Sequence, residues 1–176
     1  EQFNFHDLTG KMNFRLNTNN RLFFSFYSGA DNYFGDNNGI AWSNNAATVQ
    51  WNHLFNDRLF LNTTIAGGGY DYFLHTDLQN AVKWNSHISN FNVKTDFSFF
   101  ARPENEVTFG AGMNGYAFNP GNLLVRGHVS PLPVLWVKSS LEFVVYGNHD
   151  VRISKIFGIN YGVRLSSWSN LGEAFE

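Results

Sequence analysis

The stretch FGINYGVRLSSW, residues Phe157–Trp168, carries two kinds of side chain in alternation. Every odd position from Phe157 to Leu165 is apolar or aromatic, and every even position from Gly158 to Ser166 is glycine or polar. Because successive side chains of a β-strand point to opposite faces, the stretch predicts a strand with one apolar and one polar face. Whether the apolar face contacts a protein core or lipid decides the fold.

The same alternation recurs along the chain, at residues 8–16, 22–26, 47–51, 91–99 and 107–113. Residues 59–74 are rich in aromatic and β-branched residues, and the run Gly67–Gly69 within them predicts a bulge, a bend or tight strand packing. No segment shows a convincing helical period. The sequence therefore predicts an all-β chain of about eight strands.

Composition restricts the class of protein. Charged residues make up 15% of the 176 residues, aromatic residues make up 18%, and the formal net charge is −2. No global basic field is present to hold nucleic acid. The chain has no cysteine, which excludes disulfides and thiolate metal sites. It also has no run of ~20 apolar residues that predicts a membrane-spanning helix, whereas a closed β-barrel crosses a membrane without one.

Short and long connections are predicted to alternate. Tight turns are expected at residues 17–20, 55–58, 102–105 and 153–155, and longer polar links from Ser28, His75 and Asn119. This pattern is typical of up-and-down transmembrane barrels with short periplasmic turns and long outer loops. Tyrosines and tryptophans near the expected strand ends predict an interfacial aromatic girdle: Tyr27, Trp42, Trp51, Tyr70, Tyr72, Trp84, Tyr116 and Trp168.

Four longer stretches carry a family resemblance: NFHDLTGKMNFRLNTNNRLFFSFYSGADNYFG from Asn4, WNHLFNDRLFLNTTIAGGGYDY from Trp51, VKTDFSFFARPENEVTFGAGMNGYAFNPG from Val93 and RISKIFGINYGVRLSSW from Arg152. In order and spacing they resemble consecutive hairpins of the barrel of TonB-dependent outer-membrane receptors, in the version common in Bacteroidetes-type bacteria. The resemblance covers most of the chain, apart from residues 122–139.

The resemblance implies a segment of about eight strands from a barrel of about 22 strands. Residues 1–176 are then expected to be part of one β-barrel domain, with no plug domain or TonB box in this chain. The implied function is energised uptake of a bulky nutrient across the outer membrane of a Gram-negative bacterium. The implied partners are outer-membrane lipid, TonB and, if the receptor is SusC-like, a SusD-like surface lipoprotein. The chain opens at Glu1 without Met or a signal-like segment, so a processed protein or a piece of a longer one is expected.

Two alternatives stay open at this point. One is a complete small eight-stranded outer-membrane barrel with a structural or adhesive role. The other is a soluble all-β ligand-binding module. The residues SNLGEAFE at the C-terminal end of the sequence read as the start of another loop, which favours the segment over the complete small barrel.

The chain offers little for catalysis or metal binding. The six histidines lie scattered, and the pair His75 and Asp77 is the best candidate for a cation site, although solvated loop residues explain it better. No nucleophile elbow or phosphate-binding loop is present. We therefore expect neither an enzyme nor a cofactor.

Candidate site residues come from the polar strand face and from one predicted loop. Charged residues there are expected to face the barrel lumen, because Arg or Lys on the lipid face near the midplane costs ~2–4 kcal/mol. They could brace the interior, bind a plug or line a substrate path. Tyr33 and Trp42 are extracellular-loop candidates that could stack on a ligand. The lumen-facing candidates are Lys11, Arg15, Lys94, Asp96 and Arg164.

Overall fold

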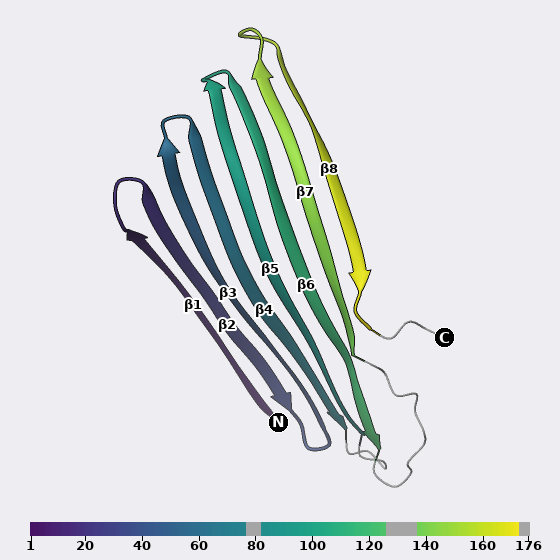
Figure 1. Cartoon of the computed structure of the whole chain (residues 1–176). Helices are drawn as coiled ribbons and strands as arrows, with labels where there is room; N and C mark the ends of the chain where they lie inside the picture. Colours follow the sequence, from purple (N-terminus) through teal and green to yellow (C-terminus); the bar gives the residue numbers. More distant parts are fainter. Residues whose placement is uncertain (77–81, 126–136, 173–176) are drawn as a thin grey trace.

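The computed structural model describes residues 1–76, 82–125 and 137–172. They form eight antiparallel strands joined in chain order in one sheet, so the predicted all-β, up-and-down topology is confirmed (Figure 1). The strands are β1 (Gln2–Arg15), β2 (Asn20–Phe34), β3 (Asn38–Asn56), β4 (Leu59–Thr76), β5 (Val82–Arg102), β6 (Asn105–Val125), β7 (Lys138–Arg152) and β8 (Gly158–Asn170).

The strands are long. The shortest, β8, has 13 residues, and β5 and β6 have 21 each. A tilted strand needs about 9–11 residues to cross the hydrocarbon of a bilayer. Every strand therefore reaches that length, and the longest strands exceed it twofold.

Four tight turns lie together at one end of the sheet, the upper end in Figure 1, as the sequence predicts. Asparagine side chains hold two of them, because an amide oxygen accepts a hydrogen bond from a backbone N–H two residues further on. The Asn17 Oδ1 atom accepts from the Asn19 N–H at 2.9 Å, and the Asn56 Oδ1 atom accepts from the Arg58 N–H at 2.9 Å.

The predicted long loop after Ser28 is wrong. β2 continues to Phe34, residues 35–37 form a short connection, and β3 begins at Asn38. Strand pairing continues there although polar side chains occur on both faces and aromatic ones lie among them, so the alternation that marks a strand in the sequence disappears. The other two predicted long links are also wrong in part, because β5 begins at Val82 and β6 continues to Val125. Residues 77–81 and 126–136 lie outside the described residues.

The pairing register places one kind of side chain on each face. Residues paired across antiparallel strands point to the same side of the sheet. One cross-strand row carries an apolar residue on each of the strands β1–β7: Met12, Phe24, Val49, Ile65, Val93, Met113 and Phe143.

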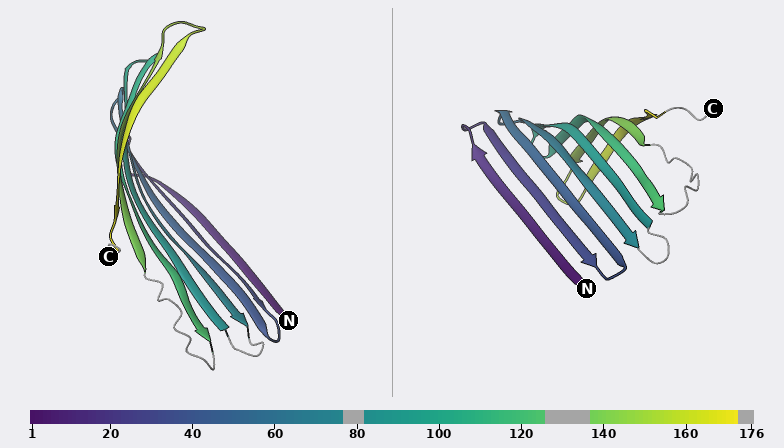
Figure 2. Two further views of the ribbon diagram at one scale, coloured as in Figure 1. Left: turned by 90° about the vertical axis from the view of Figure 1, so that its right-hand side faces the viewer. Right: turned by 90° about the horizontal axis from the view of Figure 1, so that it is seen from below.

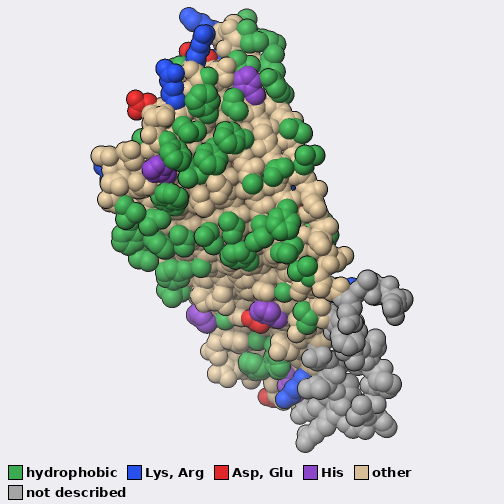
Figure 3. Space-filling view, viewed as in Figure 1, with side chains coloured by type: hydrophobic (Ala, Val, Ile, Leu, Met, Phe, Trp, Pro, Cys, Tyr) green, Lys and Arg blue, Asp and Glu red, His purple; other side chains and the backbone are tan. Residues whose placement is uncertain are grey.

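This apolar face is exposed. Phe91 is 45% exposed, Phe143 is 51% exposed and Val163 is 67% exposed. Figure 3 shows hydrophobic side chains across all the strands, with most charged side chains towards the two ends. The sheet bends and twists (Figure 2). On the polar face, the carboxylate side chains of Asp96 and Glu142 are only 19% and 21% exposed.

No protein core covers the apolar face in the described part of the chain. Leu61 and Val144 are the buried hydrophobic residues of the described part of the chain. A soluble sandwich buries its apolar faces against a second layer, and the described strands form a single layer. This arrangement does not support the soluble alternative. No helix among the described residues is long and apolar enough to cross a membrane.

The sheet is open at both sides. Within the described residues, β1 pairs with β2 alone and β8 pairs with β7 alone. The outer edges of β1 and β8 therefore lack a strand partner. A complete small barrel closes by pairing its first and last strands, so the sheet does not support that alternative either.

The glycines Gly67–Gly69 do not form the bulge that the sequence allows. The register of β4 runs through them without a shift on either side. A Cβ atom at Gly68 would lie 2.7 Å from the carbonyl oxygen of Asn45. Close strand packing therefore explains Gly68, whereas a Cβ atom at Gly67 or Gly69 would meet no atom closer than 3.4 Å.

The register shifts lie elsewhere. They occur at Leu54–Asn56, Asn85–His87 and Phe100–Arg102. Opposite the second of them stands Gly121 with a φ of 102°, a conformation that favours glycine.

Candidate functional site

A single row of polar residues crosses the whole polar face. Each residue of the row is paired in register with the next. We call it the polar row: Arg15, Arg21, Asn52, Asn62, Asp96, Gly110, Tyr146 and Arg164. Three of the five residues predicted to face the lumen therefore belong to one line across the sheet, Arg15 on β1, Asp96 on β5 and Arg164 on β8.

The centre of the polar row is the Asp96 cluster, formed by Lys94, Asp96 and Tyr146. The Lys94 Nζ atom lies 3.1 Å from the Asp96 Oδ2 atom. The Tyr146 hydroxyl donates a hydrogen bond to the other carboxylate oxygen, Oδ1. The Lys94 ammonium also lies 5.4 Å from the centroid of the Tyr146 ring, within range of a cation–π contact. Both oxygens of the carboxylate thus have a donor, which compensates its partial burial.

A glycine on the intervening strand makes this cluster possible. Asp96 on β5 and Tyr146 on β7 both pair with Gly110 on β6. A Cβ atom at Gly110 would lie 2.6 Å from the Tyr146 hydroxyl oxygen and 2.5 Å from the Thr95 carbonyl oxygen. The missing side chain lets the tyrosine reach across β6 to the aspartate.

A second chain of polar contacts, the amide ladder, joins four strands. The Asn92 amide donates to the Asn114 Oδ1 atom, and the Asn114 Nδ2 atom donates to the Glu142 Oε2 atom at 2.8 Å. The Arg164 guanidinium lies 3.8 Å from the other Glu142 oxygen. The ladder braces β5 to β8 on the polar face and offers amide donors and acceptors to a polar molecule.

Large aromatic side chains gather on the polar face, between the polar row and the end of the sheet opposite the tight turns. Register puts them on the same face as the Asp96 cluster, and we call them the aromatic shelf. The Tyr116 and Trp168 rings stack with centroids 5.8 Å apart. The members of the shelf are Tyr33, Trp42, Tyr70, Tyr72, Tyr116 and Trp168.

The shelf corrects two predictions. Tyr33 and Trp42 lie in β2 and β3, and the loop assigned to them from the sequence does not exist. The second prediction is an aromatic girdle at the membrane interface, inferred from residues near the strand ends. Most of these residues belong to the shelf, on the polar face, because the pairing register decides which face of the sheet a side chain is on. Trp51 does lie on the apolar face, where its Nε1–H donates to the Asn20 Oδ1 atom at 3.0 Å.

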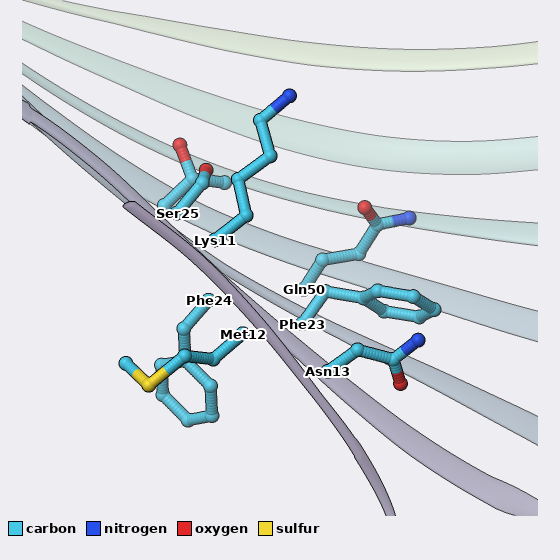
Figure 4. A pocket seen from close by; sticks show the side chains of 8 residues that line it. Lys11, Met12, Asn13, Phe23, Phe24, Ser25 and Gln50 are labelled. Atoms are coloured by element: carbon cyan, nitrogen blue, oxygen red, sulfur yellow. The ribbon is translucent and has the colours of Figure 1, made fainter. Parts of the chain in front are cut away.

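Lys11 lines a recess beside the edge strand β1. The recess has a volume of about 290 Å³ and is bounded by side chains of β1, β2 and β3. Figure 4 shows Lys11, Ser25 and Gln50 on one side of the ribbon and Met12 and Phe24 on the other. Since side chains of both faces border it, the recess opens around the sheet edge and does not enclose a ligand.

Charge is unevenly distributed on the polar face. Lys94 and Arg164 each lie near a carboxylate, whereas no ion pair involves Lys11, Arg15 or Arg21 in the part of the chain that the structure describes. The structure thus places all five charged candidates on the polar face but joins only Lys94 and Asp96 directly. Their contact with a lumen, a plug or a solute stays a prediction.

The described residues contain no group of three or more metal-ligating side chains. Of the candidate cation pair, His75 belongs to β4 and Asp77 lies outside the described residues. The pair His87 and Asp71, with 2.7 Å between the Nδ1 and Oδ1 atoms, is exposed on the apolar face and was not predicted. Asp71 and His87 are not close in the sequence and become neighbours only because β4 pairs with β5 in this register.

Comparison with known proteins identifies the fold. No family model matches the chain, and no curated protein matches it. The ferric-catecholate import receptor Fiu from E. coli K12, in its closed form, superposes with a TM-score of 0.71 at 13% identity, over 94% of this chain and 34% of that protein.

Two further structures agree. The ferric citrate transporter FecA, unliganded, gives a TM-score of 0.66 at 10% identity, over 96% of this chain and 30% of that protein. The ferric preacinetobactin receptor BauA from Acinetobacter baumannii gives 0.60 at 9% identity, over 95% of this chain and 34% of that protein. The chain spans about a third of the length of these proteins. The sheet matches barrel segments of TonB-dependent receptors, which confirms the predicted fold.

Proposed function

We propose that this chain is part of the wall of a TonB-dependent receptor in the outer membrane of a Gram-negative bacterium, and that the receptor takes up a bulky nutrient. One observation carries the proposal. All eight strands share one exposed apolar face and one polar face, in an open sheet whose two edges can pair with further strands. A lipid-exposed barrel wall needs both faces, because hydrocarbon lies outside it and water or a plug lies inside.

The apolar face has the dimensions that a bilayer requires. On β5 the apolar side chains run from Phe91 to Phe99, which is about 26 Å along a strand that rises ~3.3 Å per residue. A tilt of ~35–45° reduces this to roughly 20 Å, close to the ~25 Å apolar band of outer-membrane barrels. The polar residues beyond Phe91, among them Ser89 and His87, would then lie outside the hydrocarbon.

In this proposal the polar face lines the interior of one β-barrel domain that includes residues 1–176. The Asp96 cluster and the amide ladder hold the wall rigid, and the aromatic shelf contacts solute near the outer end. The unpaired Lys11, Arg15 and Arg21 provide positive charge towards a plug or solute. A transport role without catalysis agrees with the import receptors and the transporter of similar fold.

The partners belong to the proposal as well. Outer-membrane lipid covers the apolar face, and TonB supplies the energy from the inner membrane. A SusD-like surface lipoprotein over the outer loops follows only from the sequence resemblance to receptors of Bacteroidetes type.

A comparison of two deletion strains tests the proposal. One strain lacks the gene that contains this chain, and the other lacks TonB. Both are grown on a panel of scarce iron chelates and oligosaccharides as limiting nutrients, and the protein is located by membrane fractionation. We expect an outer-membrane protein and a nutrient whose uptake both deletions abolish. A protein found outside the outer membrane would contradict the proposal, as would loss of uptake in the first strain alone.

A further inference from the structure

The β7–β8 turn differs from the other three tight turns. Residues 153–157 have the sequence ISKIF, whereas the other turns consist mainly of Asn, Thr, Asp, Arg, Pro and Glu. Ile156 is 97% exposed, and Ile153 and Phe157 are 61% and 56% exposed. An isolated exposed apolar side chain is ordinary, but three in a turn of five residues form a patch that needs a partner.

The turn has a defined shape. The backbone N–H groups of Ile153 and Ser154 both donate to the Phe157 carbonyl oxygen at 3.0 Å. The Ser154 hydroxyl oxygen accepts a hydrogen bond from the Ile156 N–H at 3.3 Å. These bonds hold the Ile156 side chain at the tip, so its exposure follows from the fold of the turn.

The apolar patch continues the apolar face of the sheet. On β7 and β8, Val151 and Ile159 are paired and lie on that face. A polar belt separates them from the apolar middle of these strands, because His149 bonds the Tyr161 hydroxyl at 2.7 Å and the Asn105 amide oxygen at 2.8 Å. Aromatic rings with polar partners are typical of the boundary between hydrocarbon and headgroups. Ile153 and Phe157 each lie four residues beyond the His149–Tyr161 pair. That is about 13 Å along the strands, or roughly 10 Å along the membrane normal at a tilt of ~35–45°, which puts the turn at the outer edge of the headgroup layer.

Two cations flank the apolar tip. Arg152 is the last residue of β7, where the register places it on the polar face, and Lys155 lies within the turn; both side chains are exposed. Neither makes an ion pair with any other described residue. Together with Ile153, Ser154 and Glu104 they line a recess of about 360 Å³ between the β5–β6 and β7–β8 turns. The recess has a net positive charge and a hydroxyl group, which suits the phosphate of a lipid headgroup despite the one carboxylate.

We propose that the β7–β8 turn is an anchor in an anionic phospholipid leaflet. Ile153, Ile156 and Phe157 enter the interfacial layer, and Arg152 and Lys155 contact headgroup phosphates. Clusters of apolar and basic residues bind anionic membranes in this way. The inference rests on the proposed function, since it requires a sheet that is already embedded in a membrane.

Spin labels on the full-length protein test the anchor. Since this chain has no cysteine, single cysteines at Ile156, Asp57 and Val163 can carry the label, with any cysteine elsewhere in the protein replaced. Asp57 is the matched position in the β3–β4 turn, and Val163 lies on the apolar face. The protein is reconstituted in vesicles of phosphatidylethanolamine and phosphatidylglycerol, and collision with a water-soluble nickel chelate is measured.

We expect the chelate to reach Asp57 freely and to be excluded from Val163 and Ile156. In the double variant Arg152→Gln, Lys155→Gln, the ratio of molecules whose turn is inserted in the membrane to molecules whose turn is exposed to water falls about 25-fold. The reason is that each cation near an anionic leaflet contributes about fivefold to this ratio. Vesicles of phosphatidylcholine alone should reproduce that loss.

Three results would overturn the inference. If Ile156 is as accessible as Asp57 while Val163 is protected, the anchor does not exist but the membrane-embedded wall stands. If Ile156 is protected equally in both kinds of vesicle and in the double variant, the tip is covered by something other than anionic lipid. If Val163 is also accessible, the proposed function fails together with the anchor.

Discussion

The hydroxyl of Tyr146 on β7 donates a hydrogen bond to the carboxylate of Asp96 on β5, across the whole width of β6. Contacts between side chains of strands that are not neighbours in a sheet require a small residue between them. Here Gly110 provides the space. This relationship makes the centre of the polar face sensitive to changes at a position that has no side chain.

Gly110→Ala should displace Tyr146 from Asp96. The added methyl group would meet the Tyr146 hydroxyl and the Thr95 carbonyl oxygen. We expect a loss of about 1–3 kcal/mol in the free energy of unfolding, as for other overpacked sites. The measurement is urea unfolding of the full-length protein in detergent. Gly147→Ala is the matched control, because no atom lies within 4 Å of a Cβ atom there. Equal stability of the two variants would contradict the close approach.

A double-mutant cycle tests the Asp96 cluster. Asp96→Ala removes an acceptor for both Lys94 and Tyr146, and Tyr146→Phe removes one donor. We expect Asp96→Ala to lower the free energy of unfolding by about 1–2 kcal/mol. The loss stays moderate because the Lys94 side chain is half-exposed and its ammonium group can be hydrated once the carboxylate is gone. The two changes should couple by at least ~0.5 kcal/mol, because the residues are in direct contact. Additive effects in urea unfolding would show that the hydrogen bond does not contribute to stability.

A charge on the apolar face should be far more costly than a charge on the polar face. Phe109→Arg places a guanidinium where we expect hydrocarbon, at a cost of ~2–4 kcal/mol near the midplane. Thr108→Arg is the matched control, because its side chain points to the other face. The quantity to measure is the free energy of folding into phospholipid bilayers. If the free energy of folding falls by the same amount in both variants, the assignment of the two faces is wrong.

The aromatic shelf should contribute to solute binding. Trp42→Ala removes a shelf ring, and Trp51→Ala removes a ring from the apolar face as a control of similar size. Once the solute is identified, we expect Trp42→Ala to weaken its binding roughly tenfold, since aromatic residues are frequent hot spots. Trp51→Ala should leave the dissociation constant unchanged. Binding of the solute to the purified full-length protein measures both effects, and a larger effect at Trp51 would exclude the shelf as the contact surface.

The sequence alone predicts the fold through one property, the alternation of side chains. Where alternation is clear, as at residues 91–99 and 158–165, both the strand and the face of each residue are predicted correctly. Lys94 and Arg164 are on the polar face for that reason.

Where the strands leave the apolar zone, alternation fades and prediction fails. The segment from Ser28 to Asn45 has polar side chains on both faces, so its pairing in β2 and β3 is invisible in the sequence. The contacts of the site depend on register between strands. Nothing in the sequence connects Asn92 with Asn114 or Asp96 with Tyr146, which are 22 and 50 residues apart.

Accessibility along β8 in a membrane tests the central claim most directly. Single cysteines are placed at each position from Ile159 to Ser166 of the full-length protein in bilayers, and reaction with a water-soluble maleimide is compared with quenching by brominated lipid. We predict a period of two, with lipid contact at Ile159, Tyr161, Val163 and Leu165 and with contact to water at the positions between them. Uniform reactivity along the strand, or lipid contact at Arg164 and water contact at Val163, would contradict the account.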